Sequence, residues 1–305
     1  MPNKNNKSSE FLHDNRLPSV TLLKTYQTLQ KDFDFEEKII FKERFKNSNG
    51  KDITLPSLCF TSKIPGPALW LIAGIHGEEP AGPNAIANKI RQIGSLSAKI
   101  PIVVMPLCNP KGYYLGWRYP NQAKFSKDTI GQSVGDSEYL LPNNQNQPDY
   151  PREKQPSCWQ SEALTKHILK ISNYFPPILS LDLHEDNMLD QGYIYSQGEK
   201  SDHDPVAREI VKILTLSHYP LHLSGKTRFD QIIDNGVIGK NPDGSIDELL
   251  AATTIFINKQ TTSGPSAKSV IVVETSAQNQ LLSQRQLAHE LLLDHLEELW
   301  KIANT

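Results

Sequence analysis

Apolar residues are distributed along this chain in short continuous runs, separated by stretches with helical spacing. The runs at residues 68–75, 100–107 and 178–183 contain few polar positions, which is typical of strands covered on both faces of a parallel sheet. Residues 83–93, between the first two runs, carry apolar side chains at the spacing of an amphipathic helix. A strand, a helix and a strand in this order predict a parallel pair joined by a right-handed crossover.

The rest of the pattern predicts further elements of both kinds. Helical spacing covers residues 19–31, 159–174, 205–216, 246–252 and 281–302, and strand-like runs cover residues 38–45, 53–61, 192–196, 254–257 and 269–273. An Asn-Ser-Asn-Gly sequence favours a hairpin between the first two of these strands. The last helix is expected to bury its apolar positions, which include Leu287, Leu291, Leu292 and Leu296. We therefore predict an α/β fold with a mixed, mostly parallel central sheet and helices on both faces.

Three stretches depart from this pattern. Residues 1–18 are polar with few periodic apolar positions, so we expect an N-terminal arm ahead of a single catalytic domain at residues 19–305. Residues 120–156 are rich in Asn, Gln, Asp, Pro and Ser, and a loop of that length inside a compact domain is usually functional or disordered. Residues 225–244 are rich in Gly and Asp and are also expected to form a loop.

Composition and charge narrow the classes of function. Hydrophobic residues make up 38% of the 305 residues and charged residues 22%, and a net charge of -2 gives no electrostatic basis for nucleic-acid binding. The three cysteines, Cys59, Cys108 and Cys158, form no Cys-x-x-Cys pair and suit a reducing compartment. No apolar run reaches the ~18 residues of a membrane helix, and the first residues lack the apolar core of a signal peptide. We therefore expect a cytoplasmic protein without a membrane partner.

Two of the predicted strands end at a histidine. The first leads into Gly-Ile-His-Gly-Glu-Glu-Pro-Ala-Gly, which places His76 and Glu79 three residues apart, and the run at residues 178–183 ends at His184. If the two strands are neighbours, these side chains meet at the carboxyl edge of the sheet, where open α/β sheets bind ligands. Imidazole and carboxylate are ordinary Zn²⁺ ligands, and a catalytic zinc usually takes three protein ligands. Alternatively, the histidines are ordinary surface or core residues and Glu78 and Glu79 favour a helix N-terminus.

A further carboxylate, Glu274, follows the apolar run at residues 269–273. A carboxylate beside a metal-bound water can act as a general base, so its position predicts a hydrolytic reaction. The alternative is a solvated glutamate at the end of a strand.

These residues resemble the zinc carboxypeptidases, and in particular their shorter branch of succinylglutamate desuccinylases, aspartoacylases and the murein-peptide amidase. The resemblance spans residues 68–277 and is carried by five motifs in the same order. They are the His-x-x-Glu of His76 and Glu79, Asn-Pro-Lys-Gly at 109–112, Gly-Trp-Arg at 116–118, Asp-Leu-His at 182–184, and Glu274.

The resemblance implies a catalytic site with one zinc ion per chain. His76, Glu79 and His184 would hold the zinc. Arg118 would stabilise the negative charge of the oxyanion, and Glu274 would transfer protons.

Four further residues are expected near this site. Asp182 lies two residues before His184 on an extended strand, so both side chains point the same way. Asp182 then either orients an imidazole or faces solvent. Asn109, in the Asn-Pro-Lys-Gly motif, Tyr193 and Arg228 are expected to contact the substrate.

The chain departs from the family at the element that holds the terminal carboxylate of the substrate. The nearest match to the family's Asp-x-Asn-Arg lies at residues 133–140, where Glu138 and Tyr139 replace the Asn and the Arg. An acidic side chain there would repel a carboxylate, and Arg152 or Arg228 are the candidates to replace the missing arginine. The family's phenolic donor has no clear match, and the candidates are Tyr193, Tyr195 and Tyr219.

The resemblance therefore implies a zinc-dependent metallopeptidase of the carboxypeptidase kind, which hydrolyses an amide bond in a peptide or amino-acid conjugate. Two alternatives stay open. One is a deacylase of small N-acyl amino acids, and the other is a non-catalytic zinc-binding protein of the same fold. The sequence does not indicate the oligomeric state.

Overall fold

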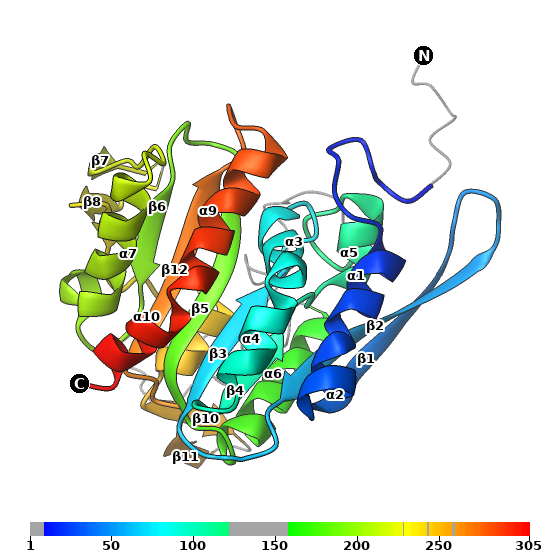
Figure 1. The fold of residues 1–305 in the computed structure, drawn as a ribbon, viewed down its shortest axis with the longest axis horizontal. Helices are drawn as coiled ribbons and strands as arrows, with labels where there is room; N and C mark the ends of the chain where they lie inside the picture. The colour runs from blue at the N-terminus through cyan, green and yellow to red at the C-terminus, as the bar shows by residue number, and fades with distance from the viewer. Residues whose placement is uncertain (1–8, 122–157, 228, 243, 258–259) are drawn as a thin grey trace.

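The computed structural model describes residues 9–121, 158–227, 229–242, 244–257 and 260–305, arranged around a large twisted sheet (Figure 1). The strand order is β1 (Glu36–Lys46), β2 (Asp52–Thr61), β4 (Ile102–Met105), β3 (Ala68–Ala73), β5 (Pro177–Asp186), β12 (Ser269–Ser276), β6 (Tyr193–Ser196), β9 (Val237–Ile238), β8 (Ile232–Asp234) and β7 (Ser224–Lys226). The central strands β4, β3, β5 and β12 are parallel, and antiparallel pairs flank them on both sides. The predicted fold class is confirmed.

Alternation of side chains along β3 divides the core into two layers. Leu69 and Leu71 belong to one hydrophobic cluster, and Trp70 and Ile72 belong to the other, because successive side chains of a strand point to opposite faces. The first face is covered by α1 (Ser19–Tyr26), α3 (Ala81–Asn88), α4 (Ile90–Leu96), α7 (Pro205–Leu216), α9 (Leu282–Asp294) and α10 (Leu296–Ala303). The second face is covered by α6 (Trp159–Ser172) and α8 (Ile246–Ala251). Figure 1 shows α3, α4, α9 and α10 lying across the near face of the sheet.

Three predicted helices are interrupted. The stretch 19–31 forms α1 and α2 (Thr28–Phe33), the stretch 83–93 forms parts of α3 and α4, and the stretch 281–302 forms α9 and α10. The prediction that Leu287 is buried was wrong, because its side chain is 65% exposed, whereas Leu292 and Leu296 lie in the core.

Three further segments refine the pattern that the sequence predicted. The strand β10 (Thr254–Ile257) pairs with β11 (Gln260–Ser263) in a separate two-stranded sheet. The predicted loop at 225–244 contains β8, β9 and most of β7 at one edge of the sheet. The Asn-Pro-Lys-Gly motif at 109–112 begins the helix α5 (Pro110–Leu115). Asn109 caps this helix by accepting a hydrogen bond from the N–H of Gly112 at 2.8 Å.

The described part of the N-terminal arm, residues 9–18, packs against α5. The N–H of Phe11 donates to the carbonyl oxygen of Tyr114 at 2.7 Å, and the side chain of Arg16 is 1% exposed. In the part of the chain that the structure describes, no helix is both long enough and apolar enough to cross a bilayer.

Candidate metal centre

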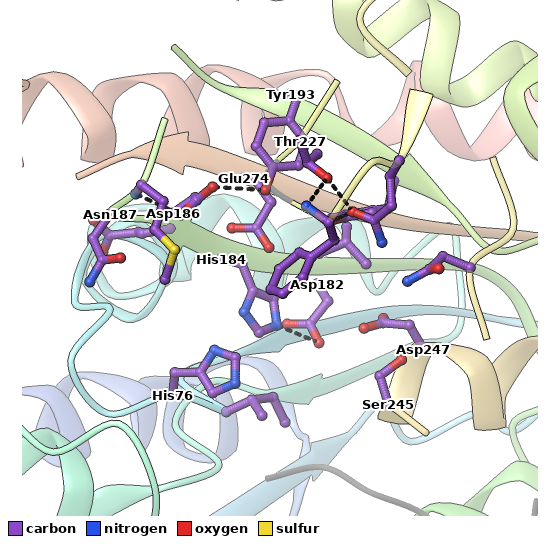
Figure 2. A pocket seen from close by; sticks show the side chains of 18 of the residues that line it. His76, Asp182, His184, Asp186, Asn187, Tyr193, Thr227, Ser245, Asp247 and Glu274 are labelled. Carbon is purple, nitrogen blue, oxygen red and sulfur yellow. Dashed lines mark hydrogen bonds and ion pairs between the residues drawn. The ribbon is translucent and has the colours of Figure 1, made fainter. Parts of the chain in front are cut away.

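The carboxyl edge of the parallel strands brings distant residues together. β3 and β5 are parallel neighbours, with Ala73 opposite Leu183, so the turn after β3 lies beside His184. β5 and β12 are also parallel neighbours, with His184 directly opposite Glu274. Figure 2 shows the side chains of His76, His184 and Glu274 turned toward one cavity.

Glu79 joins the two histidines. Its Oε1 lies 2.7 Å from Nδ1 of His76, and its Oε2 lies 2.9 Å from Nδ1 of His184. The three side chains are buried, and one donor atom from each falls within 4.8 Å of the others. Two imidazoles and a carboxylate at this spacing form a donor set that suits a metal ion such as Zn²⁺. The chemistry of the residues therefore fits the metal that the sequence predicted.

Electrostatics keep two of these side chains in the form that binds a metal. Burial lowers the pKa of His76 to about 4, helped by the nearby charge of Arg118, so this imidazole is neutral near pH 7. Burial would raise the pKa of Glu79, but the two histidines outweigh it and hold this pKa well below its ordinary value. A neutral imidazole and an ionised carboxylate are ready to coordinate a cation.

His184 is held differently. Burial would lower its pKa, but the carboxylates of Asp182 and Glu79 outweigh burial and raise the pKa well above its ordinary value. Because an imidazole binds a metal only in its neutral form, metal binding at Nδ1 of His184 would release a proton.

Asp182 lies on the expected side of its strand. Its Oδ2 is 3.2 Å from Nε2 of His184, and the residue is fully buried. A carboxylate in this place fixes the orientation and the tautomer of an imidazole. Asp247 of α8 also has a carboxylate oxygen within 4.8 Å of donor atoms of Asp182 and His184. The sequence pattern does not single out Asp247, because an acidic residue in the first turn of a helix is ordinary.

Arg118 lines the same cavity. One terminal nitrogen of its guanidinium donates to Oε1 of Glu79 at 2.9 Å and to Oε1 of Glu78 at 3.1 Å. Its carbonyl oxygen accepts hydrogen bonds from the N–H of Gly77 and from the side-chain amide of Asn109, both at 3.1 Å. The backbone of the arginine is therefore fixed beside the turn that carries His76.

Asn109 is fixed by hydrogen bonds in this structure. Its amide caps α5 and holds the carbonyl of Arg118, and the residue is 2% exposed and does not line the large cavity. Asn109 therefore positions the arginine and the helix, and its expected contact with the substrate stays a prediction.

Glu274 contributes a carboxyl group from the strand next to His184. Burial raises its pKa to about 8, with partial compensation by His184 and a further increase from Glu79. Near pH 7 such a group can both hold and release a proton, which is what a general acid and base requires.

The cavity has a volume of about 1020 Å³ and extends from the histidines across β6 and the segments that follow it. Tyr193 lines it, and its hydroxyl donates to Oδ2 of Asp186 at 2.9 Å. Tyr195 also lines the cavity, whereas Tyr219 does not and accepts a hydrogen bond from the N–H of Ser276. Arg228 lies outside the described residues, as do Glu138, Tyr139 and Arg152.

Comparison by sequence with family models and with curated proteins gave no match. Solved structures do match. A proposed metallopeptidase from Shewanella baltica has a TM-score of 0.69 and 19% identity, with 91% of each chain covered. Another from Shewanella amazonensis has a TM-score of 0.67 and 19% identity, with 90% of each chain covered. Carboxypeptidase A from Helicoverpa armigera has a TM-score of 0.53 and 12% identity, covering 91% of this chain and 71% of its own.

At these identities the likeness concerns the arrangement of the backbone. The match in backbone arrangement covers about nine-tenths of the chain in each comparison. The chain has the fold of the metallo-carboxypeptidases.

Proposed function

We propose that this protein is a zinc-dependent hydrolase that cleaves an amide bond in a peptide or a peptide-like amino-acid conjugate. The observation that carries the proposal is the cluster of His76, Glu79 and His184, whose donor atoms lie within 4.8 Å of one another. The two histidines of this cluster line the same cavity as Arg118 and Glu274. Proteins of the same fold are named as metallopeptidases and carboxypeptidases, which favours a peptide over other amides as the substrate.

The three ligands would hold one zinc ion, and the zinc would supply Lewis-acid chemistry and lower the pKa of a bound water. Glu274 would take a proton from the attacking water and pass it to the leaving amine. Arg118 would stabilise the oxygen that becomes negative as the carbonyl is attacked. Glu274 lies on the strand β12, and the backbone of Arg118 is held by a hydrogen bond from Gly77. Little movement of either residue is therefore needed during the reaction.

The cavity is large enough for more than one amino-acid residue of a substrate. Its volume of about 1020 Å³ reaches the upper end of ordinary small-molecule sites. Tyr193 lies directly opposite Glu274 in the sheet register, so its hydroxyl is a candidate to bind the substrate next to the scissile bond.

The variant Glu274→Gln tests the proposal. It should keep about one zinc per chain and lose about 10²–10⁴-fold in turnover of short peptides, because glutamine cannot carry the proton. Metal content and release of free amino acids are measured together. The matched control is Glu199→Gln, which changes an exposed glutamate outside the cavity lining and should behave as the parent protein.

Two outcomes would contradict the proposal. A parent protein that binds no zinc, or a Glu274→Gln variant that turns over peptide at the parental rate, would each refute it. Release of acetate or succinate from N-acyl amino acids, without any cleavage of peptides, would replace the peptide substrate with an acyl one.

A further inference from the structure

The segment at residues 9–18 lies against the back of the turn that carries His76 and Glu79. Within this segment, Arg16 makes the hydrogen bonds to that turn. The stem and guanidinium of Arg16 lie between two rings, with the guanidinium carbon 4.9 Å from the ring centre of Phe11 and 4.7 Å from that of Tyr113. A side chain enclosed in this way has little freedom to change its hydrogen bonds.

All five N–H groups of Arg16 have acceptors. Nε and one N–H of Nη2 bind the carboxylate of Asp14, at 2.9 Å and 2.6 Å for the nearest oxygens. The two N–H groups of Nη1 donate to the carbonyl oxygens of Gly77 at 2.7 Å and Tyr113 at 2.8 Å. The remaining N–H of Nη2 points to the carbonyl oxygen of Glu78 at 3.4 Å. A guanidinium has no further donors, so this set is complete.

Two of these acceptors belong to the metal-binding turn itself. Gly77 and Glu78 are the two residues between His76 and Glu79, and Arg16, which does not line the cavity, binds the carbonyl oxygens of both. The N–H of Gly77 is held as well, because it donates to the carbonyl of Arg118 at 3.1 Å. The backbone between the two ligands is therefore fixed by groups from two separate segments.

The burial of this charge also argues for a specific role. An arginine side chain that is 1% exposed loses its hydration, and its stability then depends on well-placed partners. Here those partners are one carboxylate, from Asp14, and carbonyl oxygens of the turn and of α5. An apolar side chain would fill the same space between the two rings without binding the turn.

We propose that Arg16 is a positioning residue for the metal centre: its guanidinium clamps the peptide groups between His76 and Glu79 and thereby sets the geometry of these two ligands. The inference rests on the proposed function, since it assigns the turn to metal binding. It makes the N-terminal segment part of the site, although none of its residues lines the cavity.

Zinc affinity of the folded protein tests this inference. The full-length parent, Arg16→Met and Arg16→Lys are stripped of metal and titrated with Zn²⁺ against a chromophoric chelator, well below the melting temperature of each. Methionine keeps the contact with the two rings but makes no hydrogen bonds. Lysine keeps the charge but has three donors and cannot reproduce the fork. The control is Arg91→Met, which removes an exposed arginine that pairs with Asp32 at 2.7 Å.

We expect Arg16→Met to bind zinc about 10- to 100-fold more weakly, as is usual when a residue that orients metal ligands is removed. Arg16→Lys should recover only part of this loss, and Arg91→Met should bind as the parent does. If Arg16→Met fails to fold, Asp14→Asn replaces it, because it weakens the hold on the guanidinium and should lower zinc affinity in the same direction.

A purely structural role for Arg16 would give a different result. It would lower the melting temperature and leave the zinc affinity of the folded variant within about twofold of the parent, which would overturn the inference. Full recovery by lysine would also overturn it, because charge alone would then suffice. A parent that binds no zinc would instead refute the proposed function.

Discussion

Replacement of Gly77 by alanine should displace the metal-binding turn. The added Cβ would stand 2.1 Å from the carbonyl carbon of Gly112 and 2.2 Å from the nitrogen of Tyr113. Ordinary contact begins at 3.4 Å, so the turn and α5 must separate by about 1.3 Å. Both neighbours are backbone atoms, and no side-chain rotation can relieve the overlap. The backbone dihedral angles are not the obstacle, since Gly77 does not have a positive φ.

This shift acts beside two proposed zinc ligands, because His76 directly precedes Gly77 and Glu79 follows two positions later. A misplacement of about 1 Å in a catalytic arrangement can reduce turnover by about 10²-fold. Overpacking in a tightly packed region also costs about 1–3 kcal/mol of stability. We therefore expect Gly77→Ala to lose both zinc affinity and turnover, with a modest decrease in melting temperature.

The assay compares zinc titration, peptide turnover and thermal melting in three proteins. The third protein is Gly94→Ala. Gly94 lies in α4, away from the cavity, and the added Cβ would stand 2.4 Å from the ring of Phe33 in α2. Gly94→Ala should lose stability and keep its zinc affinity. The reasoning is refuted if Gly77→Ala binds zinc and turns over substrate as well as Gly94→Ala does, because the turn would then tolerate the displacement.

Three further predictions concern single side chains, two at the proposed site and one in α6. Arg118→Gln should retain zinc and lose about 10²–10³-fold in kcat/KM, and an unchanged kcat/KM would exclude Arg118 from charge stabilisation. Asp182→Asn should weaken zinc binding by about 10- to 100-fold in the chelator titration; equal affinity would show that the imidazole needs no such partner. Burial lowers the pKa of His167 to about 4 from 6.5, so its contribution to stability is present above pH 6.5 and is lost as the pH falls toward 4. His167→Gln should therefore flatten the decrease of melting temperature between pH 6.5 and 4, and an unaltered slope would contradict this.

The site residues that could be predicted from the sequence all lie at the end of an apolar run. His184 and Glu274 lie near the carboxyl ends of β5 and β12, and parallel neighbours bring such ends to the same edge of a sheet. The side on which Asp182 lies was also predictable, because side chains alternate along a strand. Their catalytic roles stay predictions until the variants above are measured.

Other features depend on tertiary contacts that leave little signal in the sequence. Arg16 binds carbonyl oxygens, which every residue possesses, so no side-chain pattern marks its partners. Asp247 reaches the site because α8 packs under the sheet, and its local sequence matches any helix start. The apolar pattern of β10 would suit either the central sheet or a local hairpin. In the fold it pairs with the next segment, β11, and the sequence pattern alone does not distinguish these two partners.

The position of β12 has a consequence for how the protein folds. This strand comes from residues 269–276 but lies between β5 and β6, so it completes the middle of the sheet late in the chain. Before it inserts, β5 and β6 each have an unpaired edge, and pairing between strands so far apart in sequence is slow. During synthesis, a chain that lacks β12 already contains both histidines and Glu79 but not Glu274. The proposed site can therefore be complete only after β12 has been synthesised and has inserted between β5 and β6.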